Sequence, residues 1–190
     1  RRQRQMCIRD RLNNINIRNG NNTAITSFFA DNNPFLHCIS VDDAAYAETN
    51  WIEVDEAVVF SEEECVVYIP DPNFKSALLD ATSINTNGDG EIQVSEAFNY
   101  SGVIRVPDLE ISDMRGLEAF VNISGLFCDG NQLRRLNVRA NTLLTELHCS
   151  SNQLTSLNLR SNAALTTLDC YSNKLKNVDI RNGNNTSIAK

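Results

Sequence analysis

The residues best suited to chemistry in this chain lie in a segment rich in side-chain oxygens, Asn85–Glu96. Gly90 stands at its sixth position and Ile92 at its eighth. Asn, Asp, Gln and Glu occupy the other positions that matter in the calcium loop of an EF-hand, where ligands come from positions one, three, five, seven, nine and twelve. The predicted Ca²⁺ ligands are Asn85, Asn87, Asp89, Glu91 through its backbone carbonyl, Gln93 directly or through water, and Glu96 as the bidentate twelfth ligand.

The charge of this loop predicts weak binding. Only Asp89 and Glu96 bring a charged ligand side chain, because Asn85 stands where the pattern prefers Asp. We therefore expect an affinity on the order of 10⁻⁴–10⁻³ M and a structural role. The alternative is a turn that needs no ion, since Asn, Gly and Asp favour turns by themselves.

Cys38 and Cys65 flank a strongly acidic stretch of the chain. From Ile39 to Phe74 there are ten acidic residues and no Lys or Arg. A disulfide between the two cysteines would close this stretch and stabilise it by about 3 kcal/mol. We predict that pair, and with it an oxidising compartment; the alternative is that all six cysteines are free thiols.

A repeat of 21 residues defines the elements that must position these groups. Cys128, Cys149 and Cys170 are separated by this spacing, and asparagines and leucines recur with it between residues 126 and 180. The apolar residues alternate as in short strands with one buried face. A period of about 20–29 residues with this leucine pattern is typical of a leucine-rich repeat solenoid. The predicted fold is thus an α/β repeat solenoid with 21-residue coils of mostly β-strand and turn.

Residues that recur at inward positions are predicted to be structural. We expect the repeated cysteines to be buried thiols that pack as small hydrophobic groups. Disulfides between stacked coils would be strained, and the spacing resembles no zinc site. We expect the repeated asparagines to satisfy backbone groups at the turns of the coils. They are Asn131, Asn152 and Asn173 in one series and Asn141 and Asn162 in another.

Two series of outward positions are candidate binding surfaces. Phe127, His148 and Asp169 differ from coil to coil, as expected of a recognition surface on a constant scaffold. Arg139, Arg160 and Arg181 form a uniform stripe, which predicts either a contact for an anion or polysaccharide or a solvated face.

The order of motifs along the chain indicates tandem units. Ile17–Thr23 is identical to Ile180–Thr186, so we expect the chain to start in one solenoid and end at the equivalent coil of another. A short strand over residues 66–69 and a helix with Asp71 as N-cap and Pro72 at its first position should follow the acidic stretch. The predicted divisions are residues 1–41, the last coils of an upstream unit; 42–65, an acidic C-terminal cap; 66–103, a helical N-terminal cap with the calcium loop; and 104–190, the truncated solenoid of the next unit.

These motifs together resemble a family of bacterial secreted leucine-rich repeat proteins. The resemblance rests on Ile69–Phe74, the loop from Asn85, Gly116–Phe120 and the coils with the L-x-C-x-x-N-x-L pattern, and it covers nearly the whole chain. It implies a secreted or bacterial cell-surface location and a role in binding or adhesion, in tandem units with an EF-hand-like N-terminal cap.

The predicted function is a non-catalytic extracellular module that uses the solenoid surface to bind a protein or a cell-surface glycan. The only histidines are His37 and His148, and no nucleophile has a base implied by spacing, which argues against an enzyme. A net charge of −7 argues against nucleic acid, and no apolar run is long enough for a membrane span. The alternatives are a spacer or stalk of tandem units and a targeting domain fused to an enzyme.

Overall fold

The chain folds into two compact units, Arg1–Val66 and Val67–Lys190. The computed structural model describes residues 14–33, 36–55 and 58–183. Cys7, which we predict to be an inward coil residue equivalent to Cys170, therefore lies outside the described residues, as does the part of the sequence duplication beyond residue 183. In the described ranges, no helix is long and apolar enough to cross a lipid bilayer.

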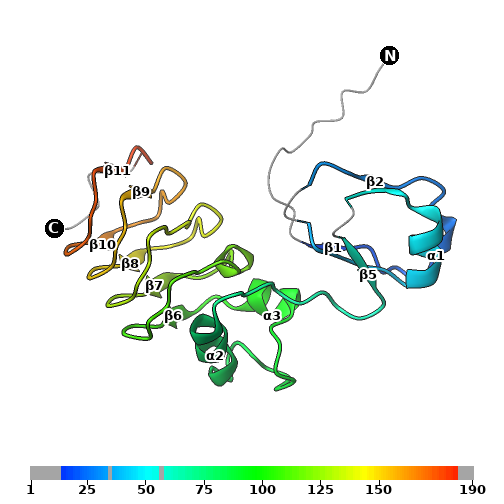
Figure 1. The fold of residues 1–190 in the computed structure, drawn as a ribbon, viewed down its shortest axis with the longest axis horizontal. Coiled ribbons are helices and arrows are strands. Elements are labelled where there is room, and N and C mark those ends of the chain that lie inside the picture. Colours follow the sequence, from blue (N-terminus) through cyan, green and yellow to red (C-terminus); the bar gives the residue numbers. More distant parts are fainter. Residues whose placement is uncertain (1–13, 34–35, 56–57, 184–190) are drawn as a thin grey trace, which may run out of the picture. The chain divides into compact units, whose positions relative to one another are not determined.

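Short parallel strands form the framework of the first unit (Figure 1). Its elements are β1 (Asn14–Asn16), the 3-10 helix η1 (Asn22–Ala24), β2 (Phe29–Ala30), β3 (Cys38–Ser40), α1 (Ala44–Asn50), β4 (Glu53–Val54) and β5 (Val59–Ser61). Strands β1, β3 and β5 form one parallel sheet, in which Ile15 lies opposite Ile39 and Ile39 opposite Phe60. Strands β2 and β4 form a second parallel pair. Parallel strands of this length, one above another, are typical of stacked coils.

Trp51 lies at the centre of the core of the first unit. Its side chain is 1% exposed and stacks on Phe28 with 4.8 Å between ring centroids. Tyr46 and Phe60 meet it edge to face. Its indole Nε1 donates a hydrogen bond of 3.1 Å to the carbonyl of Ile25, so the one polar atom of this buried ring is satisfied.

The predicted disulfide between Cys38 and Cys65 is confirmed. Cys38 begins β3, and Cys65 follows β5 by four residues. Ser40 supports the bond, because its Oγ donates to Cys65 Sγ and accepts from the Cys65 backbone N–H, each at 3.1 Å. The acidic stretch is therefore folded: it contains α1 and β4, and its strand β5 extends the sheet of the preceding coils.

The second unit is a solenoid whose coils carry short parallel strands (Figure 1). Its elements are α2 (Pro72–Asp80), α3 (Val94–Asn99), β6 (Val103–Arg105), the 3-10 helix η2 (Leu117–Ala119), β7 (Gly125–Phe127), β8 (Glu146–His148), β9 (Ser156–Asn158), β10 (Thr167–Asp169) and β11 (Asn177–Asp179). Strands β6, β7, β8 and β10 form one sheet, and β9 and β11 form another. Leu147 lies opposite Leu126 on one side and Leu168 on the other, so the 21-residue period sets the register. The predicted leucine-rich repeat solenoid is confirmed.

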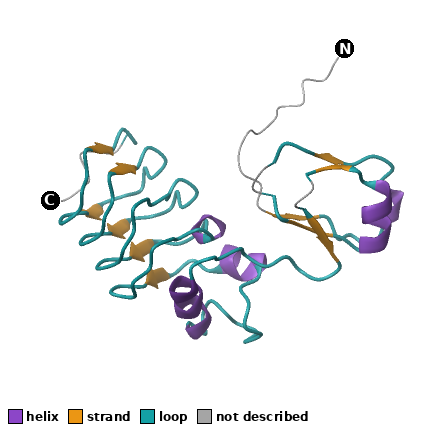
Figure 2. Cartoon of the chain, viewed as in Figure 1, coloured by secondary structure: helices purple, strands orange, loops and turns teal. Residues whose placement is uncertain are grey.

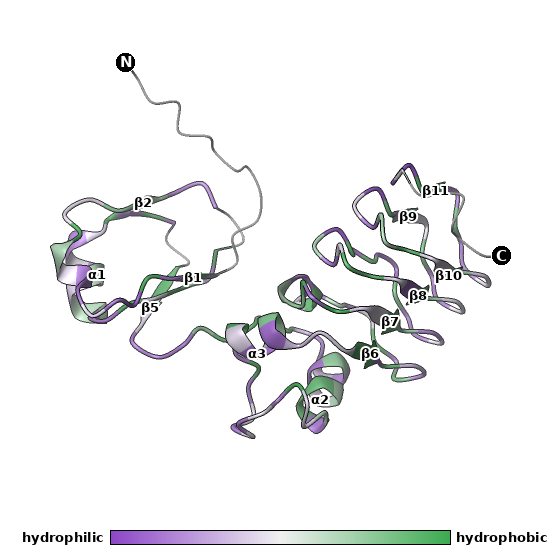
Figure 3. Cartoon of the chain, turned by 180° about the vertical axis from the view of Figure 1, so that it is seen from behind, coloured by the Kyte–Doolittle hydropathy of each residue, from purple (hydrophilic) through white to green (hydrophobic). Residues whose placement is uncertain are grey.

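One apolar core runs through the stacked coils. Leu126, Leu147 and Leu154 are fully buried, as are Cys128 and Cys149. Each coil in Figure 3 has both green, hydrophobic segments and purple, hydrophilic ones, as expected when side chains alternate between core and solvent. Because each coil buries its apolar face on the next, no coil is stable by itself.

Two helices cover one end of this stack, ahead of β6 (Figure 2). Asp71 caps α2 as predicted: its side chain accepts the backbone N–H groups of Asn73 and Phe74, each at 3.1 Å. Phe74 and Leu78 then enter the same core as the first coils. A buried helix face against the end of a solenoid replaces the neighbour that the first coil lacks.

The predicted strand over residues 66–69 is wrong. Val66 forms an isolated bridge, and the Val67 N–H donates to the Ile92 carbonyl at 2.7 Å. The partner segment turns into helix α3 at Val94. The partner segment is therefore too short to form a ladder of strand hydrogen bonds with residues 66–69.

The repeated asparagines bind the backbone of neighbouring coils, as predicted. Asn152 Nδ2 donates to the carbonyls of Cys128 and Cys149, and its Oδ1 accepts from the Leu133 N–H at 3.0 Å. Asn131 and Asn173 make equivalent bonds one coil away on either side. The thiols of Cys128, Cys149 and Cys170 are free, in agreement with their predicted packing role.

Candidate functional site

The outward side chains of the four-stranded sheet form a continuous row, which we call the strand-face column. It consists of Arg105 on β6, Phe127 on β7, His148 on β8 and Asp169 on β10. The strand register places each of these residues directly opposite the next. The column therefore crosses the sheet at right angles to its strands.

Adjacent members of the column are in contact. The Arg105 guanidinium carbon lies 3.9 Å from the centroid of the Phe127 ring. Phe127 and His148 stack with 4.2 Å between centroids and 10° between planes. His148 Nδ1 lies 3.7 Å from an Asp169 carboxylate oxygen. Cation–π and aromatic contacts of this kind are worth about 0.5–1.5 kcal/mol each, so the side chains of the column order one another.

Arg105 belongs to the column but was not among the predicted surface residues. It precedes Phe127 by 22 residues, whereas the later members are separated by 21. The signal that could have found it is Ile104, the inward aliphatic residue beside it, which pairs with Leu126. The predicted residues Phe127, His148 and Asp169 are brought together by the fold.

The column has the chemistry of a contact surface. It presents a cation at one end, two half-buried rings in the middle and a carboxylate at the other end. Buried aromatic and arginine side chains are the residues that dominate the energy of protein interfaces.

The arginine stripe is partly neutralised in the structure. Arg160 and Arg181 both pair with Asp179, at 2.7 and 2.8 Å, and the Asp179 side chain is only 15% exposed. Arg139 lies one coil further away, where Asn137 replaces the aspartate. The three arginines therefore do not form a row of equivalent cations.

The predicted calcium loop is folded by its own side chains. Asn85, Asn87 and Asp89 each use Oδ1 to accept a backbone N–H from two or three residues further on, at 2.9–3.1 Å. Gly88 and Gly90 adopt left-handed backbone angles, with φ of 69° and 86°. The residues at positions one, three and five thus face the same turn.

Glu96 closes the loop and starts helix α3. One of its oxygens accepts hydrogen bonds from Thr86 N, Thr86 Oγ1 and Asn87 N, and the other accepts from Gln93 N. Burial alone would raise the pKa of this carboxyl, but these hydrogen bonds outweigh burial and lower it. Glu96 is therefore ionised at neutral pH.

The loop fits a hard cation by the type of its donors. Among the described residues, no group of three or more His, Cys, Asp or Glu side chains is arranged to hold a metal, so a cation at this loop would need amide oxygens as well. The amide nitrogens of Asn87 and Gln93 both donate to Asp89 Oδ2, at 3.0 and 2.6 Å. A half-turn of either amide would present an oxygen at the same point. The side chain of Glu91 binds Lys75, which leaves its backbone carbonyl for position seven.

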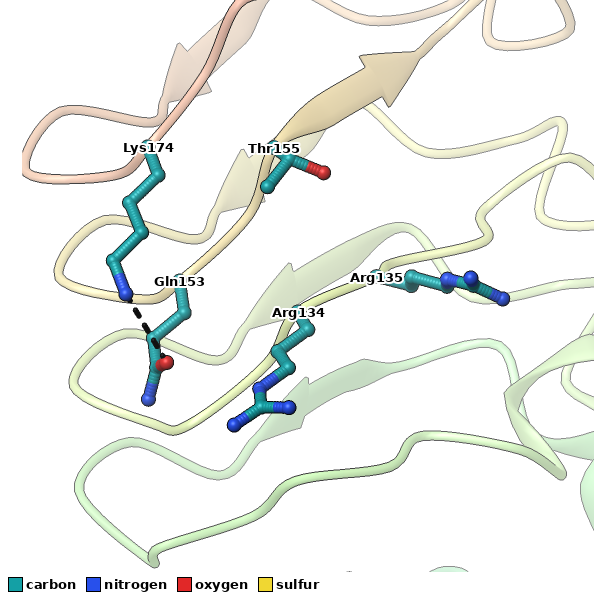
Figure 4. Close-up of a pocket in the computed structure, with 5 residues that line it drawn as sticks. All are labelled: Arg134, Arg135, Gln153, Thr155 and Lys174. Carbon is teal, nitrogen blue, oxygen red and sulfur yellow. Dashed lines mark hydrogen bonds between the residues drawn. The ribbon is translucent and has the colours of Figure 1, made fainter.

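A shallow depression of about 390 Å³ also lies on the second unit (Figure 4). We call it the basic depression, and it is lined by Arg134, Arg135, Gln153, Thr155 and Lys174. Lys174 Nζ reaches Gln153 Oε1 at 3.4 Å. In Figure 4 the guanidinium of Arg134 extends beside Gln153, while Arg135 extends away from them. The sequence analysis did not single out these residues.

Together, the coils, the asparagine series and the stacked thiols define a leucine-rich repeat solenoid with a cysteine ladder. No protein-family model matches the chain, and neither does any curated protein. Among solved structures, the chain is similar to the functional domain of InlJ from Listeria monocytogenes, which is described as including a cysteine ladder. The two are 30% identical, with a TM-score of 0.53, over 60% of this chain and 24% of that chain.

Two other Listeria monocytogenes structures are similar at lower identity. An internalin, InlF, is 17% identical over 59% of this chain and 36% of that one, with a TM-score of 0.48. Internalin C2 is 20% identical over 57% of this chain and 54% of that one, with a TM-score of 0.48. The chain thus spans a quarter to about half of the lengths of these proteins.

Proposed function

We propose that the second unit is a non-catalytic binding module that recognises a protein through the strand-face column. The observation that carries this proposal is the column itself. Its four outward side chains touch one another and differ in chemistry, while the inward neighbours Ile104, Leu126 and Leu147 are uniformly aliphatic and buried. A constant scaffold with a varied outer row is what a recognition surface requires.

The column favours a protein partner of particular character. Phe127 and His148 offer ring faces and edges that suit apolar or aromatic side chains. Arg105 and Asp169 place opposite charges at the two ends, so a partner needs an acidic group near β6 and a basic group near β10. The likeness to the InlJ domain supports a module of this class.

A secreted or cell-surface location is part of the proposal. The disulfide between Cys38 and Cys65 supports it, because such bonds persist in oxidising compartments. The same location provides calcium, which the loop would need at its low expected affinity.

The test is a binding screen of the whole chain against arrays of extracellular proteins and of glycans, with and without calcium. Wild type is compared with Phe127→Ala and with Thr142→Ala, an exposed residue outside the column. We expect at least one protein whose binding is weakened about 30-fold by Phe127→Ala, as for a central aromatic contact, and unchanged by Thr142→Ala. Protein binding that does not depend on Phe127 would contradict a role for the column, and no binding of any kind would favour the spacer alternative.

We also propose that calcium binds the loop and holds α2 and α3 against the first coil. Asn85, Asn87, Asp89, Gln93 and Glu96 would supply side-chain oxygens, and Glu91 its carbonyl. The bound ion would neutralise Asp89 and Glu96. The support is the loop closure by Glu96, which joins Thr86 and Asn87 to the start of α3.

Calcium titration of the folded chain tests this second proposal. At a tenfold excess over Kd, calcium should stabilise the second unit by about 1.4 kcal/mol. This corresponds to a rise in Tm of about 4 °C. Asp89→Asn should abolish the rise, whereas Asp80→Asn, an equal charge change just before the loop, should keep it. An unchanged Tm with unchanged amide exchange at Gly90, or an equal rise with Mg²⁺, would mean a turn without a specific calcium site.

A further inference from the structure

One part of the second unit is positively charged, although the chain as a whole is acidic. Residues 131–183 contain seven Lys or Arg and three Asp or Glu, a net charge of +4, within a chain whose net charge is −7. The remaining residues therefore carry −11. A positive stretch in an acidic chain directs anions to one place.

Three cations of this stretch border the basic depression. In the part of the chain that the structure describes, Arg134, Arg135 and Lys174 form no ion pair, whereas Arg160 and Arg181 share Asp179. Two arginines of the stripe are paired with a carboxylate, whereas the three cations of the basic depression are not, within the described ranges. A ligand at the depression does not have to displace an internal carboxylate.

The donors of the depression come from three successive coils. Arg134 follows Asn131 by three residues, Gln153 follows Asn152 by one, and Lys174 follows Asn173 by one. The Gln153 side-chain oxygen accepts from Lys174, and its amide N–H₂ points away from Lys174 (Figure 4). Coils stack about 4.8 Å apart, so Arg134 and Lys174 belong to coils separated by about 10 Å.

We propose that the basic depression binds an acidic polysaccharide through its sulfate or carboxylate groups. The planar guanidinium of Arg134 can hold such a group with two parallel hydrogen bonds, and Lys174 adds a point charge two coils away. Cations held at a fixed separation suit a polymer with regularly spaced anionic groups better than one small anion. None of the five lining residues is aromatic, so the bases of a nucleic acid find nothing here to stack on.

Heparin oligosaccharide is the probe for this site, measured by calorimetry on the whole chain. We expect binding at about 0.15 M salt that weakens steadily as salt rises, since exposed charges are screened. The double variant Arg134→Gln/Lys174→Gln should bind about tenfold more weakly, because each exposed charge contributes a few-fold. A carboxylated polysaccharide without sulfate, measured in parallel, shows which anionic group is recognised.

Three comparisons decide the result. Arg139→Gln/Arg160→Gln makes the same charge change on the stripe and should leave heparin affinity within about twofold. Phe127→Ala should also leave it unchanged, so that failure here and failure of the column proposal are separate outcomes. The proposal is overturned if neither polysaccharide binds, if the stripe variant weakens binding equally, or if duplex DNA of equal charge binds as tightly.

Discussion

Asp71 joins helix α2 to the first coil through one carboxylate. Its Oδ1 caps the helix, and its Oδ2 accepts from Ser112 N at 2.9 Å, Ser112 Oγ at 3.0 Å and Asp113 N at 3.2 Å. Burial alone would raise the pKa of this carboxyl, but the hydrogen bonds from Ser112, Phe74 and Asp113 outweigh burial and lower it. The charged form is therefore the one that the folded state prefers.

This preference predicts how the second unit responds to acid. A folded-state pKa below the unfolded value gives stability that is present above about pH 4 and is lost as pH falls through the folded pKa. Asp71→Asn should cost about 2 kcal/mol at pH 7, because its N–H₂ group has to face N–H donors on one side or the other. Urea unfolding at pH 7 and pH 3 measures both effects, and the loss of stability between the two should be smaller in Asp71→Asn. Asp80→Asn, on the exposed end of the same helix, is the control, and an equal change there would contradict a special role for Asp71.

A recurring turn follows each rung of the cysteine ladder. Gly130, Ser151 and Ser172 occupy equivalent positions, and all three have positive φ, at 66°, 53° and 51°. A residue with a Cβ pays about 1 kcal/mol for this left-handed conformation. The coil of Gly130 already has glycine there, whereas Ser151 and Ser172 adopt the same conformation with a side chain and are therefore strained.

Replacing a strained serine should stabilise the solenoid. Ser151→Gly removes the left-handed penalty, and chemical unfolding should reveal a gain of about 0.5 kcal/mol after the greater freedom of glycine in the unfolded chain is subtracted. Ser161→Gly is the matched change at a residue without positive φ, and it should lower stability by a similar amount. Destabilisation by both substitutions would show that Ser151 is not strained.

The cysteine ladder predicts a graded reactivity of its thiols. Burial raises the pKa of Cys128 and Cys149, both of which are fully buried, and also that of the partly exposed Cys170. Because the thiolate is the reactive form, iodoacetamide should modify Cys170 first and the other two only on unfolding. Mass spectrometry of timed digests gives the order, with a sample in denaturant as the reference. Modification of Cys149 at the rate of Cys170 would mean that the coils open separately.

Periodicity explains which elements could be predicted. The coils, the asparagine series and the inward cysteines follow from a spacing that any 21-residue register reproduces. Helix α1 could not be predicted in this way. Its seven residues Ala44–Asn50 are shorter than two turns, and its N-cap Asp43 is one of many acidic residues nearby. The predicted strand at residues 66–69 had the right composition, but a strand also needs a partner of equal length.

The candidate surfaces were predictable in part for the same reason. Phe127, His148 and Asp169 share a period, so their alignment could be inferred; the stacking of the first two could not. The pairing of Arg160 with Asp179 links adjacent coils, and only the structure reveals which side chain reaches across. The basic depression combines residues from different repeat positions, and no single spacing connects Arg134 with Lys174.

At the scale of the whole molecule, the two units have separate cores and separate supports. Trp51, the only tryptophan of the chain, lies in the core of the first unit, which the disulfide also closes. The second unit depends on its solenoid core and the helices α2 and α3. A change confined to one unit should therefore be visible in a signal specific to that unit.

The disulfide provides the test of this independence. Cys38→Ser/Cys65→Ser should destabilise the first unit by about 3–4 kcal/mol, since the closed loop spans 27 residues. Tryptophan fluorescence during urea unfolding should then report an earlier transition, while amide exchange in β7 and β8 stays as in wild type. A parallel loss of protection in those strands would show that the units unfold together. Wild type treated with reductant should reproduce the behaviour of the double variant.

The register of the sheet also allows the outward residues of the solenoid to be exchanged independently of its core. Each strand of the four-stranded sheet is held by an inward leucine or isoleucine and by backbone bonds to its neighbours, so the outward residues are not part of the core. Positions 105, 127, 148 and 169 can therefore be randomised together in a combinatorial library while the core stays fixed. Under the proposed function, partner choice could then change by one side chain per coil while the fold stays the same.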